Sequence, residues 1–129
     1  MFRTGILAVA AVSAVAPLAA HAAARVPFDR AAFEAAQAAG KPLLVEVSAT
    51  WCPVCASQSR SIEAALKDPR NRRLTVFRLD FDKQKAEWQR FGVHRQGTLI
   101  AFKGKQENGR LEFVTDKAAI DQLIGKIAA

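Results

Sequence analysis

The architecture of this 129-residue chain is set by residues 43–55, which read Leu43-Leu44-Val45-Glu46-Val47-Ser48-Ala49-Thr50-Trp51-Cys52-Pro53-Val54-Cys55. The short apolar run at 43–47 predicts a buried strand, interrupted only by Glu46. Proline is tolerated in the first turn of a helix, where its missing N–H is not needed, so Pro53 predicts a helix from 53 to about 66. The two cysteines of the chain therefore follow a strand and open a helix.

The segments on either side of this stretch also alternate between helix and strand. Asp29 as N-cap and Gly40 at the end bound a helix over 30–40, and Asp68-Pro69 ends the helix that starts at Pro53. Further strands are expected at 74–81, 98–102 and 111–114, and further helices at 83–91 and after Asp116. Six phenylalanines are expected in the core: Phe33, Phe77, Phe81, Phe91, Phe102 and Phe113.

The expected order of elements is therefore α-β-α-β-α-β-β-α. Helical crossovers predict parallel central strands, and a polar turn over 104–109, ending in Asn-Gly, predicts a hairpin for the last two strands. Helices on both faces of one mixed sheet define a three-layer α/β domain.

The first 22 residues have the pattern of a secretory signal peptide. A short basic start, Met1-Phe2-Arg3-Thr4, precedes an uncharged apolar run over 5–16, and Ala20-His21-Ala22 supplies the small residues of a cleavage site. Cleavage is expected after Ala22, with Ala24 as second choice, which leaves one domain over 23–129. An uncleaved anchor is disfavoured because spanning needs about 20 apolar residues. The pattern predicts a bacterial periplasmic protein.

The composition excludes several classes of protein. With 50% hydrophobic and 24% charged residues, the chain is expected to fold as one domain rather than to be disordered. Two cysteines are too few for a disulfide-dense mini-protein. The chain has a formal net charge of +7, and its basic cluster is expected to be a solvated face or to make weak contact with an anionic membrane surface. The cluster consists of Lys67, Arg70, Arg72 and Arg73. Nucleic acid is not an expected partner of an exported protein.

The spacing Cys52-Pro53-Val54-Cys55 predicts thiol–disulfide chemistry, because it places two sulfurs one helical turn apart. A thiolate at Cys52 is stabilised by the free N–H groups of the helix start, so Cys52 is expected to exchange with a substrate disulfide. Cys55, inside the first turn and more buried, would then resolve the mixed disulfide. Three other readings remain: a structural disulfide, copper held by the two thiolates, or zinc, which needs about four ligands.

Glu46 is the second candidate site residue. A carboxylate in the middle of an apolar strand, six residues before Cys52, is expected to lie buried beneath the cysteine pair. There it could take or give the proton of Cys55 during exchange, directly or through a water molecule. The alternative is a carboxylate that points to solvent or pairs with Arg78.

The segment 43–55 resembles the active-site region of the thioredoxin superfamily, and the similarity continues through 74–80, 91–93 and 98–103. This resemblance covers most of residues 28–129 and implies a thioredoxin-like fold. It places Glu46 where thioredoxins carry a buried aspartate, and Arg78 where they often carry a lysine. It also implies a substrate-binding surface, formed by Trp51, Pro53, Val54, Gly97 and Thr98.

The sequence departs from the family pattern at one position near the site. The family usually has a cis-proline just before the strand that begins here at Thr98, whereas this chain has Gln96-Gly97-Thr98. Because a cis bond is costly without proline, a trans peptide is expected at Gly97, with glycine allowing a close backbone approach. The dipeptide Pro53-Val54 matches neither the Gly-Pro of thioredoxin nor the Pro-His of strong periplasmic oxidants.

Together these features predict an exported thiol–disulfide oxidoreductase that exchanges a Cys52–Cys55 disulfide with protein thiols and disulfides. The reductase or isomerase direction is favoured, with electrons from a membrane donor protein. No metal or organic cofactor is expected, because the cysteine pair carries the electrons, and the protein is expected to be a monomer. The alternative is a non-catalytic thioredoxin-fold module that binds a partner protein or delivers copper.

Overall fold

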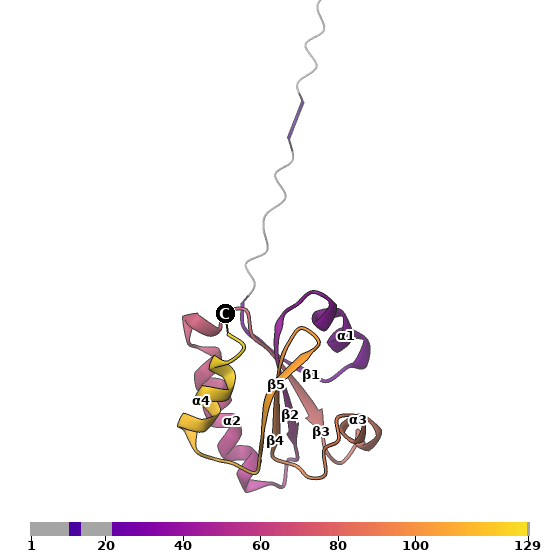
Figure 1. Cartoon of the computed structure of the whole chain (residues 1–129), viewed down its shortest axis with the longest axis vertical. Helices are drawn as coiled ribbons and strands as arrows, with labels where there is room; N and C mark the ends of the chain where they lie inside the picture. The colour runs from indigo at the N-terminus through magenta and orange to yellow at the C-terminus, as the bar shows by residue number, and fades with distance from the viewer. Residues whose placement is uncertain (1–10, 14–21, 129) are drawn as a thin grey trace, which may run out of the picture.

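The structure, a computed structural model, describes residues 11–13 and 22–128. The predicted signal peptide lies outside the described residues, apart from 11–13 and Ala22, and stays a prediction. Within the described ranges, no helix is both long and apolar enough to cross a membrane. Residues 22–128 form one α/β unit around a central sheet (Figure 1).

The sheet has five strands in the order β1-β3-β2-β4-β5. They are β1 (Ala24–Pro27), β2 (Pro42–Ser48), β3 (Thr75–Asp80), β4 (Thr98–Lys103) and β5 (Gln106–Glu112). Strands β1 and β2 run parallel to β3 on either side of it, whereas β4 is antiparallel to β2 and β5 is antiparallel to β4. The predicted three-layer α/β architecture with a mixed sheet is confirmed.

The prediction that the central strands are all parallel was wrong for β4. The helix between β3 and β4 is α3 (Lys85–Arg90), which has only six residues. At 1.5 Å per residue it spans about 9 Å, roughly half the length of a six-residue strand at 3.3 Å per residue. The chain therefore does not cross back to the end of the sheet where β2 and β3 begin. Instead, β4 starts near their carboxyl ends and runs antiparallel to β2.

Two further expectations at the sheet edges need correction. The edge strand β1 was not predicted, because its four residues, which end in Pro27, show no strand pattern. Proline is tolerated there because an edge strand leaves some of its N–H groups unpaired.

The final hairpin is present, but its turn is at Gly104-Lys105, where Gly104 has a φ of +58°. The Asn108-Gly109 pair lies inside β5, close to an irregularity in its pairing with β4.

Helices cover both faces of the sheet (Figure 1). One face carries α1 (Arg30–Ala38) and α3, and the other carries α2 (Pro53–Leu66) and α4 (Lys117–Gly125); a short 3-10 turn, η1 (Pro69–Asn71), follows α2. Asp29 caps α1 as expected, since its carboxylate accepts the Ala32 N–H at 2.9 Å.

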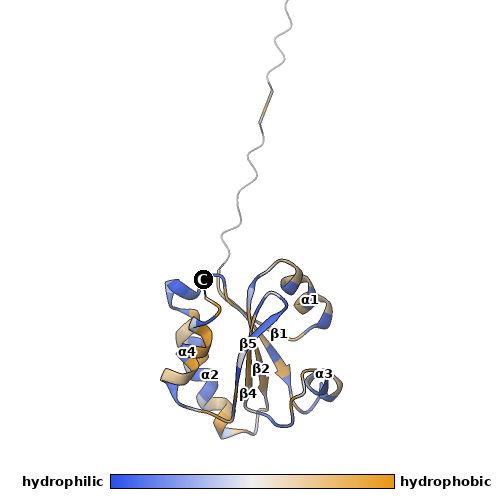
Figure 2. Ribbon diagram, viewed as in Figure 1, coloured by the Kyte–Doolittle hydropathy of each residue, from blue (hydrophilic) through white to orange (hydrophobic). Residues whose placement is uncertain are grey.

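Alternation along the strands divides the core into two layers. Val45 and Val47 of β2 pack with the phenylalanines beneath α1, whereas Leu44 packs with Ile62 of α2 on the opposite face. Colouring by hydropathy shows apolar residues on the central strands and on α4, and hydrophilic residues at the β4–β5 hairpin and on parts of the other helices (Figure 2). Glu46 and Ser48 share the face of Leu44, so they lie on the side of the sheet that α2 covers.

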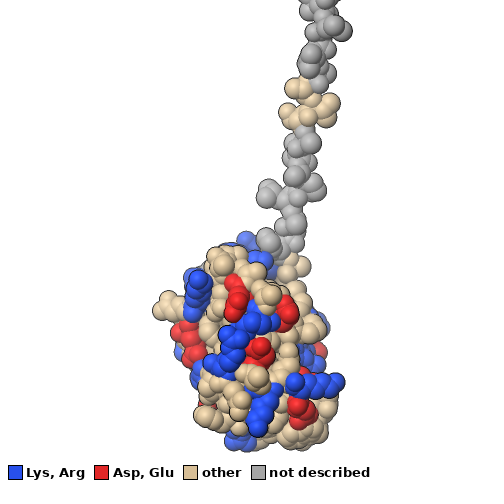
Figure 3. Space-filling view, turned by 90° about the vertical axis from the view of Figure 1, so that its right-hand side faces the viewer, with Lys and Arg blue, Asp and Glu red and all other residues tan. Residues whose placement is uncertain are grey.

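The surface carries charges of both signs. On the face drawn in Figure 3, lysine and arginine side chains alternate with aspartate and glutamate rather than forming one basic field. Because β2 is the middle strand of the sheet, its carboxyl end delivers residues 49–55 to the centre of one end of the molecule, where the cysteines lie.

Candidate active site

The two cysteines lie at the junction between β2 and α2. Cys52 is the N-cap of α2, and its sulfur accepts a hydrogen bond from the Cys55 N–H at 3.2 Å. Pro53 occupies the first turn of the helix, where it leaves no N–H unsatisfied. Both cysteines are free thiols, so the geometry described is that of the reduced pair. The helix start therefore directs one N–H group at the sulfur of Cys52.

Both sulfurs are almost fully covered by protein. The exposed fraction is 3% for Cys52 and 2% for Cys55, so burial differs less between them than the sequence suggested. A substrate disulfide can therefore reach the cysteine sulfurs only over a small exposed area. Among residues 11–13 and 22–128, no three His, Cys, Asp or Glu side chains are grouped so as to hold a metal ion.

The environment of Cys55 opposes its thiolate. Burial raises the pKa of this thiol to about 11, and the hydrogen bond and charge of Cys52 add to the rise. The backbone at Ala49 and a hydrogen bond from the side chain of Ser48 act in the opposite direction. At neutral pH, Cys55 therefore holds its proton, which must leave before the sulfur can act as a nucleophile.

Trp51 stands beside the cysteines as an exposed aromatic surface. Its side chain is 58% exposed, and its indole N–H donates to Asp82 at 2.9 Å. The ring meets the edge of Phe81, which in turn stacks on Trp88 with ring centroids 4.8 Å apart. This row of rings and the hydrogen bond hold the indole in one orientation, so it offers a preformed apolar contact.

On the other side of the cysteines, Gly97 is wedged between two side chains. The Gln96–Gly97 peptide is trans, and Gly97 has a φ of +76°. A Cβ atom at this position would lie 3.0 Å from Cδ2 of Phe113 and 3.4 Å from Cγ1 of Val54. Only glycine fits this backbone and this space without strain.

The polar groups of Gly97 are used inside the protein. Its N–H donates to the Val47 carbonyl, and its carbonyl accepts from the Phe113 N–H, both at 2.8 Å. The same carbonyl accepts from Nε2 of Gln58, a side chain that is completely buried. These bonds join the Gly97 loop to β2, to the end of β5 and to α2, so the loop is fixed against the cysteine helix.

The other residues predicted at the substrate surface have different environments. Pro53 is exposed and Val54 is half-buried beside the cysteines. Thr98 is completely buried, and its hydroxyl donates to the Arg95 carbonyl at 2.9 Å. Thr98, like Gly97 before it, is therefore covered by protein in this structure.

Glu46 is buried beneath this end of the sheet, as expected, but its partner was not foreseen. The side chain is 1% exposed, and both of its oxygens accept hydrogen bonds from Arg25, at 2.6 to 3.0 Å. Arg25 also donates to Ser59 and Glu63 of α2. The alternative pairing with Arg78 is wrong, because Arg25 occupies the carboxylate.

Three residues of this region were missed or misplaced by the sequence reasoning. Ser48 ends β2 and Arg25 lies in β1, and neither residue belongs to a sequence motif that would mark it as part of a site. Phe113 was expected in the core but is 38% exposed, with a φ of +59° and the guanidinium carbon of Arg95 3.6 Å from its ring centroid. Its ring covers Gly97 instead, because the chain turns out of β5 at that residue.

Two cysteines at the start of a helix, directly after a buried strand of a five-stranded mixed sheet, define a thiol–disulfide oxidoreductase. Comparison with known families agrees with this class. The thioredoxin family model matches residues 25–126, and the chain belongs to the thioredoxin family.

Individual relatives show how far the similarity extends. The chain is 32% identical over 96 residues to a thioredoxin of Echinococcus granulosus, covering 74% of this chain and 87% of that one. It is 34% identical over 92 residues to a bifunctional thioredoxin reductase/thioredoxin of Mycobacterium leprae; the match covers 71% of this chain but spans only about a fifth of that longer protein (20%). A crystal structure of Trxlp from Edwardsiella tarda superposes with a TM-score of 0.75 and 42% identity, over 78% of this chain and 97% of that one.

Proposed function

We propose that this thiol–disulfide oxidoreductase is exported to the periplasm, and that it works there as a monomer in the reductase or isomerase direction on protein disulfides. The export proposal is supported by the basic start, apolar run and Ala-x-Ala pattern of residues 1–22. The periplasm is an oxidising compartment, so a protein kept reduced there needs an electron donor. A membrane protein that passes electrons across the membrane would meet that need.

The geometry of the cysteine pair carries the proposed chemistry. The Cys52 thiolate attacks one sulfur of a substrate disulfide, forms a mixed disulfide and releases the first substrate thiolate. Cys55 then loses its proton and attacks the Cys52 sulfur, which forms the Cys52–Cys55 disulfide and releases the second substrate thiolate. The substrate gains two electrons and the cysteine pair loses two, so no bound cofactor is needed.

The reducing direction is supported by the acid at Glu46 and by the residues between the cysteines. A strong oxidant owes its potential to a stabilised reduced form with a readily formed thiolate. Strong periplasmic oxidants of this superfamily have Pro-His between their cysteines, whereas this chain has Pro53-Val54 and so lacks a histidine that could stabilise a thiolate at Cys52.

The proposed substrate surface is formed by Trp51, Pro53 and Val54. Gly97 and Thr98 are proposed to join it only when the Phe113 ring moves aside, because both residues are buried in this structure. Trp51 supports this proposal with its exposed and fixed ring. Because both sulfurs are covered, an extended substrate segment is favoured over a bulky folded surface.

Glu46 is proposed to relay the proton of Cys55 through a water molecule. Its position on the α2 face of β2, two residues from Ser48, supports an indirect role. Both carboxylate oxygens already accept hydrogen bonds from Arg25, so direct contact with the thiol would require that pair to open. Glu46→Gln should therefore slow turnover most at neutral pH, where Cys55 must be deprotonated.

The equilibrium reduction potential of the Cys52–Cys55 pair tests the proposed direction. A value near about −270 mV against glutathione or dithiothreitol buffers is expected for a reductase, whereas about −120 mV would indicate an oxidant. The purified protein should also reduce a disulfide-bonded protein substrate, and Cys52→Ser should abolish this activity. A wild-type protein without activity would contradict the proposal.

Export needs a separate experiment. The full chain, expressed in a diderm bacterium, should be recovered in the periplasmic fraction with a mass that corresponds to cleavage after Ala22. A matched variant with Ala20→Leu and Ala22→Leu should accumulate uncleaved, because the small residues of the cleavage site are lost. Cytoplasmic recovery of the wild-type chain at full length would reject the proposed localisation.

A further inference from the structure

The ring of Phe113 covers a small site above Gly97. The point where a Cβ atom of Gly97 would lie is 3.0 Å from Cδ2 of Phe113 and 3.4 Å from Cγ1 of Val54. The same point is 3.7 Å from Oε1 of Gln58. Val54 in turn packs against the cluster that contains both cysteines. The covered site therefore adjoins the cysteine pair.

Gln58 gives this site a hydrogen-bond acceptor without a partner. Its side chain is completely buried, and Nε2 donates to the carbonyls of Gly97 and Val114, at 2.8 and 2.9 Å. These two carbonyls fix the orientation of the amide, because the reverse orientation would place oxygen against oxygen. Within residues 11–13 and 22–128, no buried side-chain nitrogen or oxygen other than Oε1 of Gln58 lacks a hydrogen bond. A buried acceptor of this kind is costly until a donor reaches it.

Phe113 lies over the site in a strained conformation. Its φ is +59°, a value that bulky residues rarely adopt. The residue is also 38% exposed, so packing holds the ring less firmly than a core phenylalanine. The guanidinium carbon of Arg95 lies 3.6 Å from the ring centroid and holds the ring by a cation–π contact. Backbone strain lowers the free energy needed to displace the ring, and strain of this kind is concentrated at ligand clamps and switches.

We propose that Phe113, held by Arg95, is a gate that an extended substrate peptide displaces, and that Oε1 of Gln58 then accepts a backbone N–H of the peptide. The site is otherwise lined by Val54 and the ring itself, so it favours an uncharged donor over a charged side chain. An extended peptide presents such donors at regular intervals along its length.

This inference rests on the proposed function and adds a determinant of its substrate class. A small disulfide reacts at the sulfurs and does not need the site above Gly97. A peptide disulfide needs the gate open, so its rate constant is proportional to the open fraction of the protein while the gate moves faster than the peptide reacts. The ratio of the two rate constants therefore reports on the gate.

The reduced protein is mixed with an excess of either hydroxyethyl disulfide or a disulfide-linked dimer of a short peptide with blocked, uncharged termini. The loss of free protein thiols gives a second-order rate constant for each substrate. Phe113→Gly removes the ring and suits the positive φ. We expect it to raise the ratio of the peptide rate constant to the hydroxyethyl disulfide rate constant about tenfold, as the open fraction rises from about a tenth to nearly one.

N-methylated peptides test the role of Gln58. The backbone amides on the two sides of the peptide cysteine are methylated one at a time, and an amide far from the cysteine is methylated as the control. In Phe113→Gly, one of the two neighbouring methyl groups should lower the peptide rate constant about tenfold, because one hydrogen bond to the buried acceptor is lost. The control peptide should react like the unmethylated one.

Matched variants separate the ring from general effects. Phe113→Ala removes the ring but keeps the backbone strain, and it should raise the ratio about as much as Phe113→Gly. Arg95→Ala leaves the ring in place without its cation, so it should raise the ratio less.

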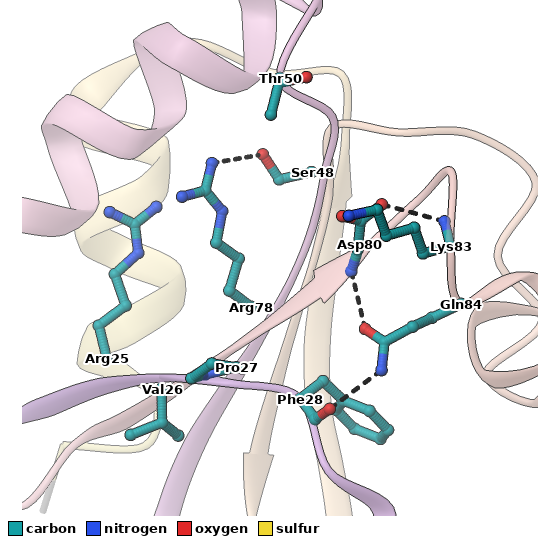
Figure 4. Close-up of a pocket in the computed structure, with 10 residues that line it drawn as sticks. All are labelled: Arg25, Val26, Pro27, Phe28, Ser48, Thr50, Arg78, Asp80, Lys83 and Gln84. Carbon is teal, nitrogen blue, oxygen red and sulfur yellow. Dashed lines mark hydrogen bonds between the residues drawn. The ribbon is translucent and has the colours of Figure 1, made fainter.

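The control for the lost cation comes from a cavity of about 660 Å³ beside the carboxyl ends of β1, β2 and β3 (Figure 4). Lys83 is exposed and lines this cavity on the β1 side of the sheet, whereas Phe113 follows β5 at the opposite edge. Lys83→Ala should leave the ratio unchanged.

The outcomes distinguish the gate from the proposed function. A wild-type protein that reacts with neither disulfide would contradict the oxidoreductase mechanism itself. A wild type that reacts with hydroxyethyl disulfide, together with an unchanged or lowered ratio in Phe113→Gly, would overturn the gate alone, because the ring would then be irrelevant or itself a substrate contact. Equal effects of all three methylated peptides would overturn the assignment of Gln58. Circular dichroism checks the folding of each variant, and Phe113→Ala and Arg95→Ala decide the question if Phe113→Gly does not fold.

Discussion

Arg25 and Glu46 form an ion pair across a strand that lies between them. Arg25 is in the edge strand β1 and Glu46 is in β2, with β3 in the middle, yet Nη2 of Arg25 is 2.6 Å from Oε1 of Glu46. The guanidinium group spans β3 on the α2 face, where Ser59 and Glu63 complete its contacts. The first strand of the domain thus holds the buried carboxylate of the active-site strand.

Replacing Arg25 by leucine should destabilise the protein by about 3 kcal/mol, because a buried charge is left without its partner. Glu46 is 1% exposed, so solvent cannot replace the lost hydrogen bonds. Chemical denaturation followed by tryptophan fluorescence would measure the change. The double variant Arg25→Leu/Glu46→Leu should recover most of the loss.

The matched control for this prediction is Lys117→Ala, which removes a pair between Lys117 and Asp121 on the surface of α4. Exposed pairs of this kind contribute less than about 1 kcal/mol. Equal effects of Arg25→Leu and Lys117→Ala would mean that the buried pair is no more important for stability than a surface pair.

Gly97→Ala should destabilise the protein by about 2 to 3 kcal/mol, because the new Cβ meets both backbone strain and a crowded site. The position has a φ of +76°, and the Cβ would lie 3.0 Å from the Phe113 ring. Gly92→Ala provides the comparison, since its φ is +67° but no atom lies within 4 Å. It should cost only the strain, about 1 kcal/mol.

A double-mutant cycle identifies the source of the crowding. Phe113→Ala should relieve part of the cost of Gly97→Ala, with a coupling free energy of about 1 kcal/mol, and should leave the cost of Gly92→Ala unchanged. Additive effects at positions 97 and 113 would show that the ring of Phe113 moves aside without cost.

The reduced protein should lose stability as the pH rises from 9.0 to about 11, the ordinary and the folded-state pKa of Cys55. The folded state holds the proton more tightly than the unfolded state, so this stability is present below 9.0 and disappears as the pH passes the folded value. Denaturation of the wild type and of Cys55→Ala over this range isolates the effect. Parallel curves for the two proteins would contradict it.

Cys55→Ser should trap substrates on Cys52, because attack on the substrate needs only the first sulfur and release needs the second. Mass spectrometry of the variant after exposure to a disulfide substrate should show a stable mixed disulfide. Cys52→Ser, its matched control, should form none, since Cys55 is buried and protonated at neutral pH. Trapping on Cys55 instead would reverse the assigned roles.

Local patterns in the sequence were sufficient to predict the main elements around the site. The apolar run of β2, the proline at the start of α2 and the aspartate caps act over a few residues, and these predictions are confirmed. The same local reasoning failed for β1, which is too short for a pattern, and for the direction of β4, which depends on how far α3 carries the chain.

The sequence by itself determined the strand, the helix and the cysteine pair between them, because hydrophobic alternation and helix capping are properties of neighbouring residues. Only the tertiary structure decided which partner each polar side chain has. The order β1-β3-β2 lets Arg25 hydrogen-bond Glu46, so that Arg78 donates to Ser48 instead. The bend after β5 places the ring of Phe113 over Gly97. These contacts join residues far apart in the chain, where ion-pair geometry and packing, rather than local pattern, select the neighbours.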